Sequence, residues 1–182
     1  MVMQLCRLLS LALLLPPLLH AQERIPELHA TAFSGETVDL PQGLRGHTAV
    51  LIVSFSQGSR DSVTGWSRRL ADDYRNSPTV LYYEMPVLAA VPRFLRGVVM
   101  GKIKKDVPPR DQPRFVPIVD HEAEWRSAVG FGKQDTGHPA GADDAYLLVV
   151  DGFGTIRFRT AAPAPTDQTY AELKRRLEAT TP

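Results

Sequence analysis

The clearest hydrophobic pattern lies in the segment 47–74. Residues 49–55 form a short run of mostly β-branched and large apolar side chains, which is typical of a central strand buried on both faces. The run breaks at Gly58, where Asp61 and Ser62 are candidate N-cap residues for a helix. Apolar residues then recur at helical spacing: Trp66, Leu70 and Tyr74. The pattern therefore predicts a buried strand, a short loop and the start of a helix beside the end of that strand.

The remaining apolar runs predict an alternation of strands and helices. Short strands are expected at 31–33, 37–40, 79–84, 146–150 and 155–160, with turns at Ser34-Gly35-Glu36 and Asp151-Gly152-Phe153-Gly154. Helices are expected at 92–105, after Asp120 as far as Gly130, and from Thr166 or Asp167 onward. A linker is expected at 161–165. The order strand, helix, strand over residues 49–84 implies a parallel, right-handed crossover, so the fold class is α/β.

The near-zero net charge of the chain argues against a nucleic-acid partner. The 182 residues carry 21 basic and 20 acidic side chains, a net charge of +1, and 43% of them are hydrophobic. This composition suits one globular domain and provides no global field for a nucleic acid. We therefore expect no nucleic-acid partner.

The amino terminus has the pattern of a secretory signal over residues 1–21. Arg7 precedes an apolar run at 8–19, and Leu19-His20-Ala21 resembles a small-residue cleavage site. The alternative is an uncleaved anchor, but the run is shorter than the ~20 residues that a bilayer needs and contains Pro16-Pro17. We expect a single periplasmic or secreted domain over 22–182.

The cysteine count restricts the chemistry. Cys6 is the one cysteine in the sequence, and it lies within the predicted signal. Cleavage would leave a chain with no thiol, without an internal disulfide, a cysteine nucleophile or a thiolate metal site.

The loop before the first predicted helix is the candidate binding site. Its residues are Gln57, Ser59, Arg60 and Ser62, which could hold an anion through backbone N–H groups and the helix dipole. The alternative is that Ser62 or Asp61 caps the helix and Arg60 is merely solvated.

The helix predicted at 92–105 belongs to a basic insertion at about 91–117. Its apolar residues are Phe94, Leu95, Val98, Val99 and Ile103, and its basic residues are Arg93, Arg96, Lys102, Lys104 and Lys105. The favoured interpretation packs the apolar face on the domain and leaves the basic face in water. The basic face is otherwise a candidate surface for a partner helix or an anionic membrane.

Metal and cofactor sites are not expected. Metal-capable side chains gather in one polar loop, at Asp135, His138, Asp143 and Asp144, but without a defined ligand spacing. The sequence also has no Gly-Lys-Ser/Thr phosphate loop, no Gly-x-Ser-x-Gly elbow and no paired His-Glu helix motif.

The layout of the chain resembles the thioredoxin-like superfamily in its redoxin form. The resemblance rests on the hairpin at 33–40, the strand at 50–55 that leads into a helix, and the closing segment 146–158. It implies a thioredoxin-like three-layer fold, with a mixed central sheet flanked by helices and an N-terminal β-hairpin. Redox-active members place cysteines where this chain has Ser59-Arg60-Asp61-Ser62-Val63, and a cis-proline where it has Asp143-Asp144-Ala145, with Pro139 further off.

Within that superfamily the chain resembles the thioredoxin-like factor that assembles the membrane sector of mitochondrial ATP synthase. The supporting residues are Ser54-Phe55-Ser56 followed by Trp66, the basic segment 92–114, and Val149-Val150-Asp151 followed by Arg157. That family resembles a non-redox chaperone for a membrane subunit, so the resemblance implies a chaperone-like role but does not identify the client.

These observations lead to one functional expectation and two rivals. We expect a thioredoxin-like binding or assembly protein with a protein partner, a membrane protein included, and no thiol–disulfide oxidoreductase, peroxidase or other enzymatic activity. One rival is an enzyme that uses the redoxin scaffold for non-thiol, metal-dependent chemistry around His138. The other is a degenerate homologue that binds and positions an oxidoreductase.

Overall fold

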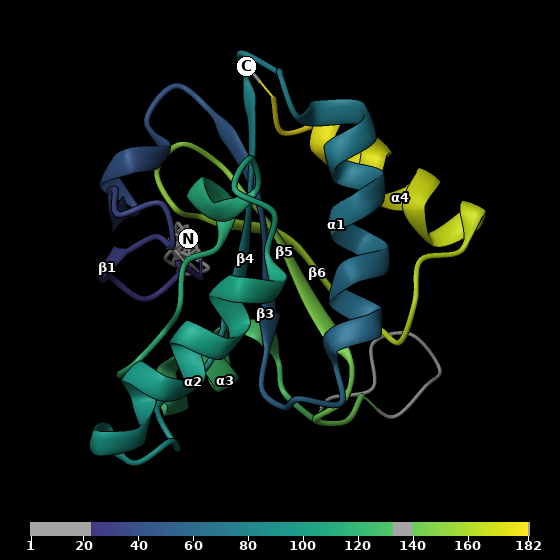
Figure 1. Cartoon of the computed structure of the whole chain (residues 1–182). Helices are drawn as coiled ribbons and strands as arrows, with labels where there is room; N and C mark the ends of the chain where they lie inside the picture. Colours follow the sequence, from purple (N-terminus) through teal and green to yellow (C-terminus); the bar gives the residue numbers. More distant parts are fainter. Residues whose placement is uncertain (1–22, 133–139, 182) are drawn as a thin grey trace, which may run out of the picture.

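The computed structural model describes residues 23–132 and 140–181, and its centre is a four-stranded mixed sheet (Figure 1). The strands are β3 (Thr48–Ser54), β4 (Val80–Pro86), β5 (Ala145–Val150) and β6 (Ile156–Ala162). Their order in the sheet is β4-β3-β5-β6, in which β3 is parallel to β4 and antiparallel to β5. The predicted parallel pairing of the two strands that flank the first helix is confirmed.

A separate antiparallel hairpin precedes the sheet. It consists of β1 (Leu28–Thr31) and β2 (Thr37–Leu40), with Gly35 at a positive φ of 98° in the connecting turn. The predicted hairpin is confirmed, although its first strand lies three residues earlier than expected. A short 3-10 helix, η1 (Gln42–Leu44), then leads into β3.

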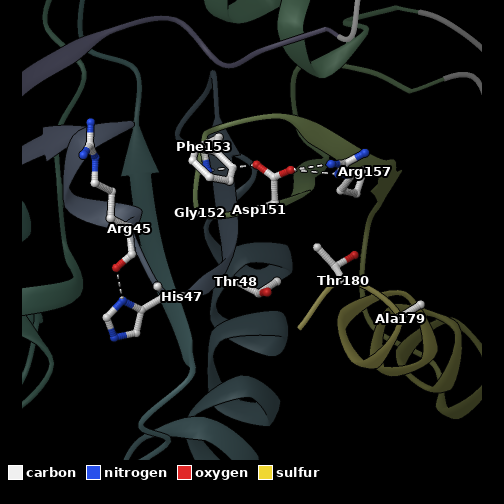
Figure 2. A pocket seen from close by; sticks show the side chains of 10 residues that line it. Arg45, His47, Thr48, Asp151, Gly152, Phe153, Arg157, Ala179 and Thr180 are labelled. Atoms are coloured by element: carbon white, nitrogen blue, oxygen red, sulfur yellow. Dashed lines mark hydrogen bonds and ion pairs between the residues drawn. The ribbon is translucent and has the colours of Figure 1, made fainter. Parts of the chain in front are cut away.

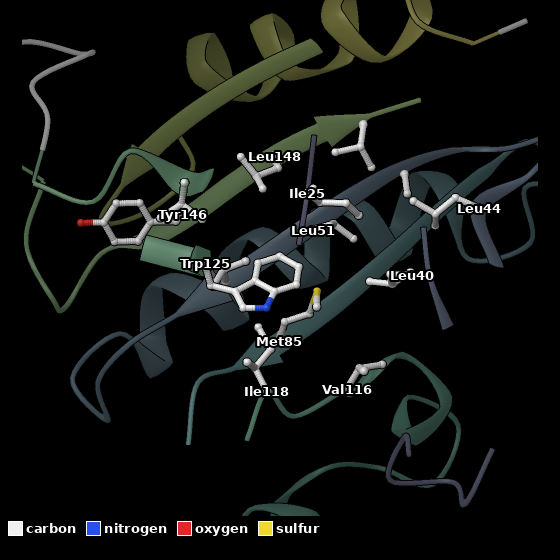
Figure 3. Close-up of a cluster of buried hydrophobic side chains, with 14 of the residues drawn as sticks. Ile25, Leu40, Leu44, Leu51, Met85, Val116, Ile118, Trp125, Tyr146 and Leu148 are labelled. Atoms are coloured by element: carbon white, nitrogen blue, oxygen red, sulfur yellow. The ribbon is translucent and has the colours of Figure 1, made fainter. Parts of the chain in front are cut away.

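Helices and the hairpin cover both faces of the sheet. The helices are α1 (Arg60–Tyr74), α2 (Arg93–Asp106), α3 (Glu122–Val129) and α4 (Asp167–Glu178), with a second 3-10 helix, η2 (Gln112–Arg114). One face packs against Trp66 and Leu70 of α1 and Leu173 of α4, the two helices on the right of Figure 1. The other face packs against Leu40 of the hairpin and Trp125 of α3 (Figure 3).

This arrangement explains the unbroken apolar run of the central strand. Alternate residues of a strand point to opposite faces. Val50 and Ile52 belong to the cluster under α1 and α4, whereas Leu51 and Val53 belong to the cluster under the hairpin and α3. Because both faces are covered, every residue of β3 is buried. The predicted three-layer α/β architecture is confirmed.

Several boundaries differ from the sequence prediction. The residue before α3 is His121, in the left-handed conformation with a φ of 60°, and not Asp120. Strand β6 continues to Ala162, into the predicted linker, because its last residues pair with Ala145 and Tyr146 of β5. The end of α3 at Gly130, with a φ of 69°, is as expected.

Some predictions fall outside the described residues. The signal at 1–21, with Cys6, and the metal-capable residues Asp135 and His138 lie there, and so does Pro139. The predicted division of the chain into a signal and one domain stays a prediction.

Candidate functional site

The candidate site is the loop between the end of β3 and the start of α1. Ser59 precedes the first helical residue but does not cap it with its side chain. Its hydroxyl donates instead to the carbonyl of Ser56 at 2.7 Å, and its N–H donates to Ser56 Oγ at 3.3 Å. The expected cap by Asp61 or Ser62 is therefore wrong, because the helix begins at Arg60 and both residues lie within its first turn.

Asp143, which lies 87 positions after Ser56 in the sequence, forms hydrogen bonds with this loop. Its carboxylate accepts a hydrogen bond from Ser56 Oγ, and its carbonyl accepts one from Ser62 Oγ at 3.4 Å. A Cβ at Gly58 would lie 2.4 Å from Asp143 Oδ1, so the carboxylate is packed directly on the loop backbone. The hydroxyl of Ser56 thus links the Ser59 amide to the Asp143 carboxylate in one closed network.

The four predicted binding residues divide into two pairs. Ser59 and Ser62 are only 1% and 6% exposed, whereas Gln57 and Arg60 are exposed. The prediction that all four contact a partner needs correction, because the two serine hydroxyls point into the network. Sequence reasoning assigned Asp143 to a metal-capable loop and missed its contact with Ser56, which lies 87 positions away.

Arg60 connects the loop to α2. Its guanidinium donates to Asp106 Oδ2 at 2.8 Å, and both side chains remain about half exposed. Arg60 is therefore neither an unpaired anion-binding group nor simply solvated. The ion pair holds the carboxyl end of α2 close to the amino end of α1.

The basic helix α2 presents a different face from the one predicted. Arg93, Lys102, Lys104 and Lys105 are exposed as expected, but Arg96 points inward. Its guanidinium donates to the carbonyls of Ala89 and Val91 at 2.8 and 2.9 Å, and it lies 4.0 Å from Asp120. Arg96 therefore anchors the start of the helix and cannot belong to a partner face.

The apolar residues of α2 also do not form one packed face. Phe94, Val98 and Leu95 are 83%, 70% and 42% exposed, and no residue of the helix is buried. Val99 and Ile103 are partly covered. The favoured interpretation, in which all five apolar residues pack on the domain, is wrong for the first three.

A buried carboxyl of β4 faces α1. Glu84 is 7% exposed, and its Oε1 accepts a hydrogen bond from Ser67 of α1. Burial raises the pKa of Glu84 to about 7, the Ser67 hydroxyl opposes the rise, and the neighbouring charge of Asp111 adds to it. Sequence reasoning missed Glu84 because a single acid in an apolar strand does not show which side of the sheet it faces.

An open pocket of about 690 Å³ lies at the opposite end of β3 (Figure 2). Its lining includes Thr48, Asp151 and Arg157. Asp151 Oδ1 accepts the N–H groups of Phe153 and Thr155, each at 2.9 Å, and its Oδ2 accepts Arg157 Nε and Nη2. Burial alone would raise the pKa of Asp151, but these hydrogen bonds hold it below its ordinary value. Asp151 thus fastens the β5–β6 turn, and both its oxygens are occupied.

Neither a metal cluster nor a spanning helix is found in the described part of the chain. Residues 23–132 and 140–181 contain no group of three or more His, Cys, Asp or Glu side chains that could hold a metal ion. Within the same ranges, no helix combines the length and the apolar character needed to cross a bilayer.

Comparison with known proteins identifies the scaffold. No family model and no curated protein matches the sequence. A protein assigned as a disulfide isomerase from Bacteroides thetaiotaomicron is similar over 87% of this chain and 88% of its own, at 15% identity and a TM-score of 0.55. A protein assigned as the thiol:disulfide interchange protein DsbE from Chlorobium tepidum covers 87% and 96%, at 14% identity and a TM-score of 0.56. The yeast mitochondrial 1-Cys peroxiredoxin covers 87% and 74%, at 16% identity and a TM-score of 0.50.

These neighbours correct one expectation. We expected a protein without enzymatic activity, because the predicted mature chain has no thiol and its loop holds no cysteine, but the solved structures that it resembles are named as thiol–disulfide proteins and a peroxiredoxin. The expectation of a non-enzyme is therefore contradicted, because it was drawn from missing cysteines alone, whereas the scaffold is shared with enzymes. At 14–16% identity, what the likeness establishes is the architecture, and the chain has a thioredoxin-like fold.

Proposed function

We propose that this chain is an extracytoplasmic binding or assembly protein that holds a protein partner against the β3–α1 loop. The observation that carries the proposal is the closed network of Ser56, Ser59, Ser62 and Asp143. Ser59 and Ser62 lie in the segment 59–63, where the resemblance places the redox cysteines of active members. In place of thiols, the hydroxyls of Ser56 and Ser62 donate hydrogen bonds to the carboxylate and the carbonyl of Asp143.

The network supports a binding role because it fixes the loop before any partner arrives. A surface that is already ordered loses less conformational entropy on association than a mobile one. The fixed backbone leaves Gln57 and Arg60 facing outward, next to the first turn of α1. Partner recognition is then assigned to these two side chains, and the buried serines position them.

The kind of partner follows from two features of the sequence. The predicted secretory signal at 1–21 directs the chain across a membrane. The resemblance to the assembly factor of the membrane sector of ATP synthase suggests a membrane protein as the partner.

Site-specific crosslinking tests this proposal. A photoreactive amino acid at position 57 should yield an adduct with a membrane protein, whereas the same group at position 68, exposed on α1, should not. Arg60→Glu should abolish the adduct at position 57 and Arg68→Glu should leave it unchanged. Equal adducts at the two positions would refute binding at the loop.

A cysteine variant separates partner capture from thiol chemistry. Cys6 is the one thiol that the sequence contains, so any insulin reduction or peroxidase turnover by the full chain should disappear in Cys6→Ser. Partner capture at position 57 should survive that substitution, because the loop network contains no sulfur. Loss of capture in Cys6→Ser would show that the partner is held through the thiol.

A further inference from the structure

The outward face of α2 combines exposed apolar side chains with exposed cations. Phe94 and Val98 lie one turn apart on this face and are 83% and 70% exposed. The exposed cations are Arg93, Lys102, Lys104 and Lys105. Within the described residues, none of these four cations forms an ion pair, and the one acid of the helix, Asp106, is paired with Arg60. The face therefore carries a concentrated positive charge beside apolar surface.

The inward side of α2 has a different composition. Arg96 fastens the helix to the carbonyls of Ala89 and Val91, and Val99, Met100 and Ile103 are partly covered. The helix is thus held to the domain along one side. The other side, with Phe94 and Val98, remains uncovered.

The apolar surface of this face is too short to bind a partner helix. A helix that docks into a groove presents apolar anchors over several turns, at spacings such as i, i+4, i+7 and i+11. From Phe94, these positions hold Val98, Gly101 and Lys105, so the apolar stripe ends after one turn. A lipid surface sets no such requirement, since one turn of apolar side chains can enter the acyl boundary while lysines contact the headgroups.

The two glycines of α2 agree with an open face. A Cβ at Gly97 or Gly101 would meet no atom within 4 Å, so packing inside the chain does not require either glycine. Both are exposed. They lower the bulk between Phe94 and the lysines, which lets the helix backbone approach a flat surface closely.

We infer that α2 is a membrane-docking helix, which binds the surface of an anionic phospholipid bilayer through Phe94 and Val98 together with Arg93, Lys102, Lys104 and Lys105. The cations supply the attraction to anionic headgroups, and the two apolar side chains enter the bilayer interface. Because Asp106 at the end of α2 pairs with Arg60, docking would hold the β3–α1 loop close to the membrane surface. The inference stands on the α2 face alone and does not depend on the function proposed for the loop.

Vesicle co-sedimentation tests the inference. The chain starting at Gln22 contains all of the described fold and lacks the apolar run at 8–19, which could bind lipid by itself. It should sediment with vesicles of equal parts phosphatidylglycerol and phosphatidylcholine in low salt, and not with phosphatidylcholine alone. Release by 0.5 M salt is expected, because screening weakens the attraction between exposed charges.

Two matched pairs of variants assign the binding to α2. Each basic residue near an anionic surface changes binding about fivefold, so Lys102→Glu/Lys105→Glu should weaken it more than tenfold. Arg45→Glu/Arg68→Glu changes the net charge equally at exposed positions of other segments and should change binding less than twofold. Phe94→Ser should weaken binding roughly tenfold. Phe153→Ser should not, although Phe153 is also exposed, at 71%.

A fluorescent variant reports insertion directly. Trp66 and Trp125 are fully buried, so their emission should not respond to vesicles. Phe94→Trp should shift to shorter wavelength with anionic vesicles, and Phe153→Trp should show no shift. Failure of the chain to bind anionic vesicles, equal losses in the two charge variants, or an unshifted Phe94→Trp spectrum would each overturn the inference.

Discussion

Helices α1 and α2 are nearly equal in length, 15 and 14 residues, yet they are held in opposite ways. α1 buries Val63, Trp66 and Leu70 against the sheet. α2 buries none of its residues and leaves Phe94 almost fully exposed. An amphipathic pattern therefore identifies a face of a helix but does not identify what covers that face.

Polar contacts sharpen the contrast. Tyr170 of α4 donates to the carbonyl of Arg69 and to Asp73 of α1, at 2.9 and 3.0 Å, and Lys174 pairs with the same Asp73. The hydrogen bond from Lys174 holds the pKa of Asp73 below its ordinary value. α2 is fastened mainly at its start, by Arg96, and at its end, by Asp106. α1 is therefore part of the core, and α2 is an attachment to it.

Truncation of a leucine in each helix should show the largest difference in the free energy of unfolding. Leu70→Ala removes a fully buried side chain, and we expect the free energy of unfolding to fall by about 3 kcal/mol. Leu95→Ala, at a position that is 42% exposed, should cost less than about 1 kcal/mol. Urea unfolding of the two variants makes the measurement. Equal losses would mean that α2 is as deeply packed as α1.

The buried carboxyl beneath α1 should make stability depend on pH. The folded-state pKa of Glu84, about 7, lies above its ordinary value of 4.5, so the folded protein binds more protons than the unfolded chain between these values. Stability should therefore fall as pH rises from 4.5 to 7 and then level off. Glu84→Gln should flatten this dependence and be more stable than wild type at pH 8, by up to about 3 kcal/mol.

Thermal unfolding at several pH values tests this dependence. The exposed Glu27→Gln serves as the control and should leave the curve unchanged. If the stability of Glu84→Gln falls with rising pH as much as that of wild type, another titratable group causes the pH dependence.

Two glycine-to-alanine substitutions, one in the β3–α1 loop and one in α2, should change stability in opposite directions. Gly58→Ala places a Cβ 2.4 Å from Asp143 Oδ1, which displaces the carboxylate from Ser56 and should cost about 1–2 kcal/mol. Gly97→Ala meets nothing within 4 Å and should stabilise the chain by about 0.5–1 kcal/mol, because alanine favours helix. Chemical denaturation gives both values. Destabilisation by Gly97→Ala would indicate that the face of α2 is covered.

The ion pair that joins α1 to α2 should have the smallest effect on stability. Arg60 and Asp106 are about half exposed, and exposed pairs contribute roughly 0.2–1 kcal/mol. A double-mutant cycle of Arg60→Ala and Asp106→Ala measures their coupling, which high salt should reduce. A coupling above about 2 kcal/mol would show that this contact, and not Arg96, governs the position of α2.

The elements of this fold were largely predictable, because their signals are local. The apolar run at 49–55 marks the central strand, Gly130 marks the end of α3, and Thr166 marks the start of α4, where its hydroxyl accepts the Thr169 N–H. The site was less predictable. Ser59 and Ser62 lie at the helix start as expected, but the hydrogen bonds from Ser56 and Ser62 to Asp143 form only after the chain has folded back.

The order of strands and helices, the single cysteine and the charge of α2 follow directly from the sequence. These depend on the types and spacing of neighbouring residues. The inward orientation of Ser59 and Ser62, the anchoring contacts of Arg96 and the exposure of Phe94 become visible only in the folded chain. Burial is set by residues far apart along the chain, and a local pattern does not contain that information.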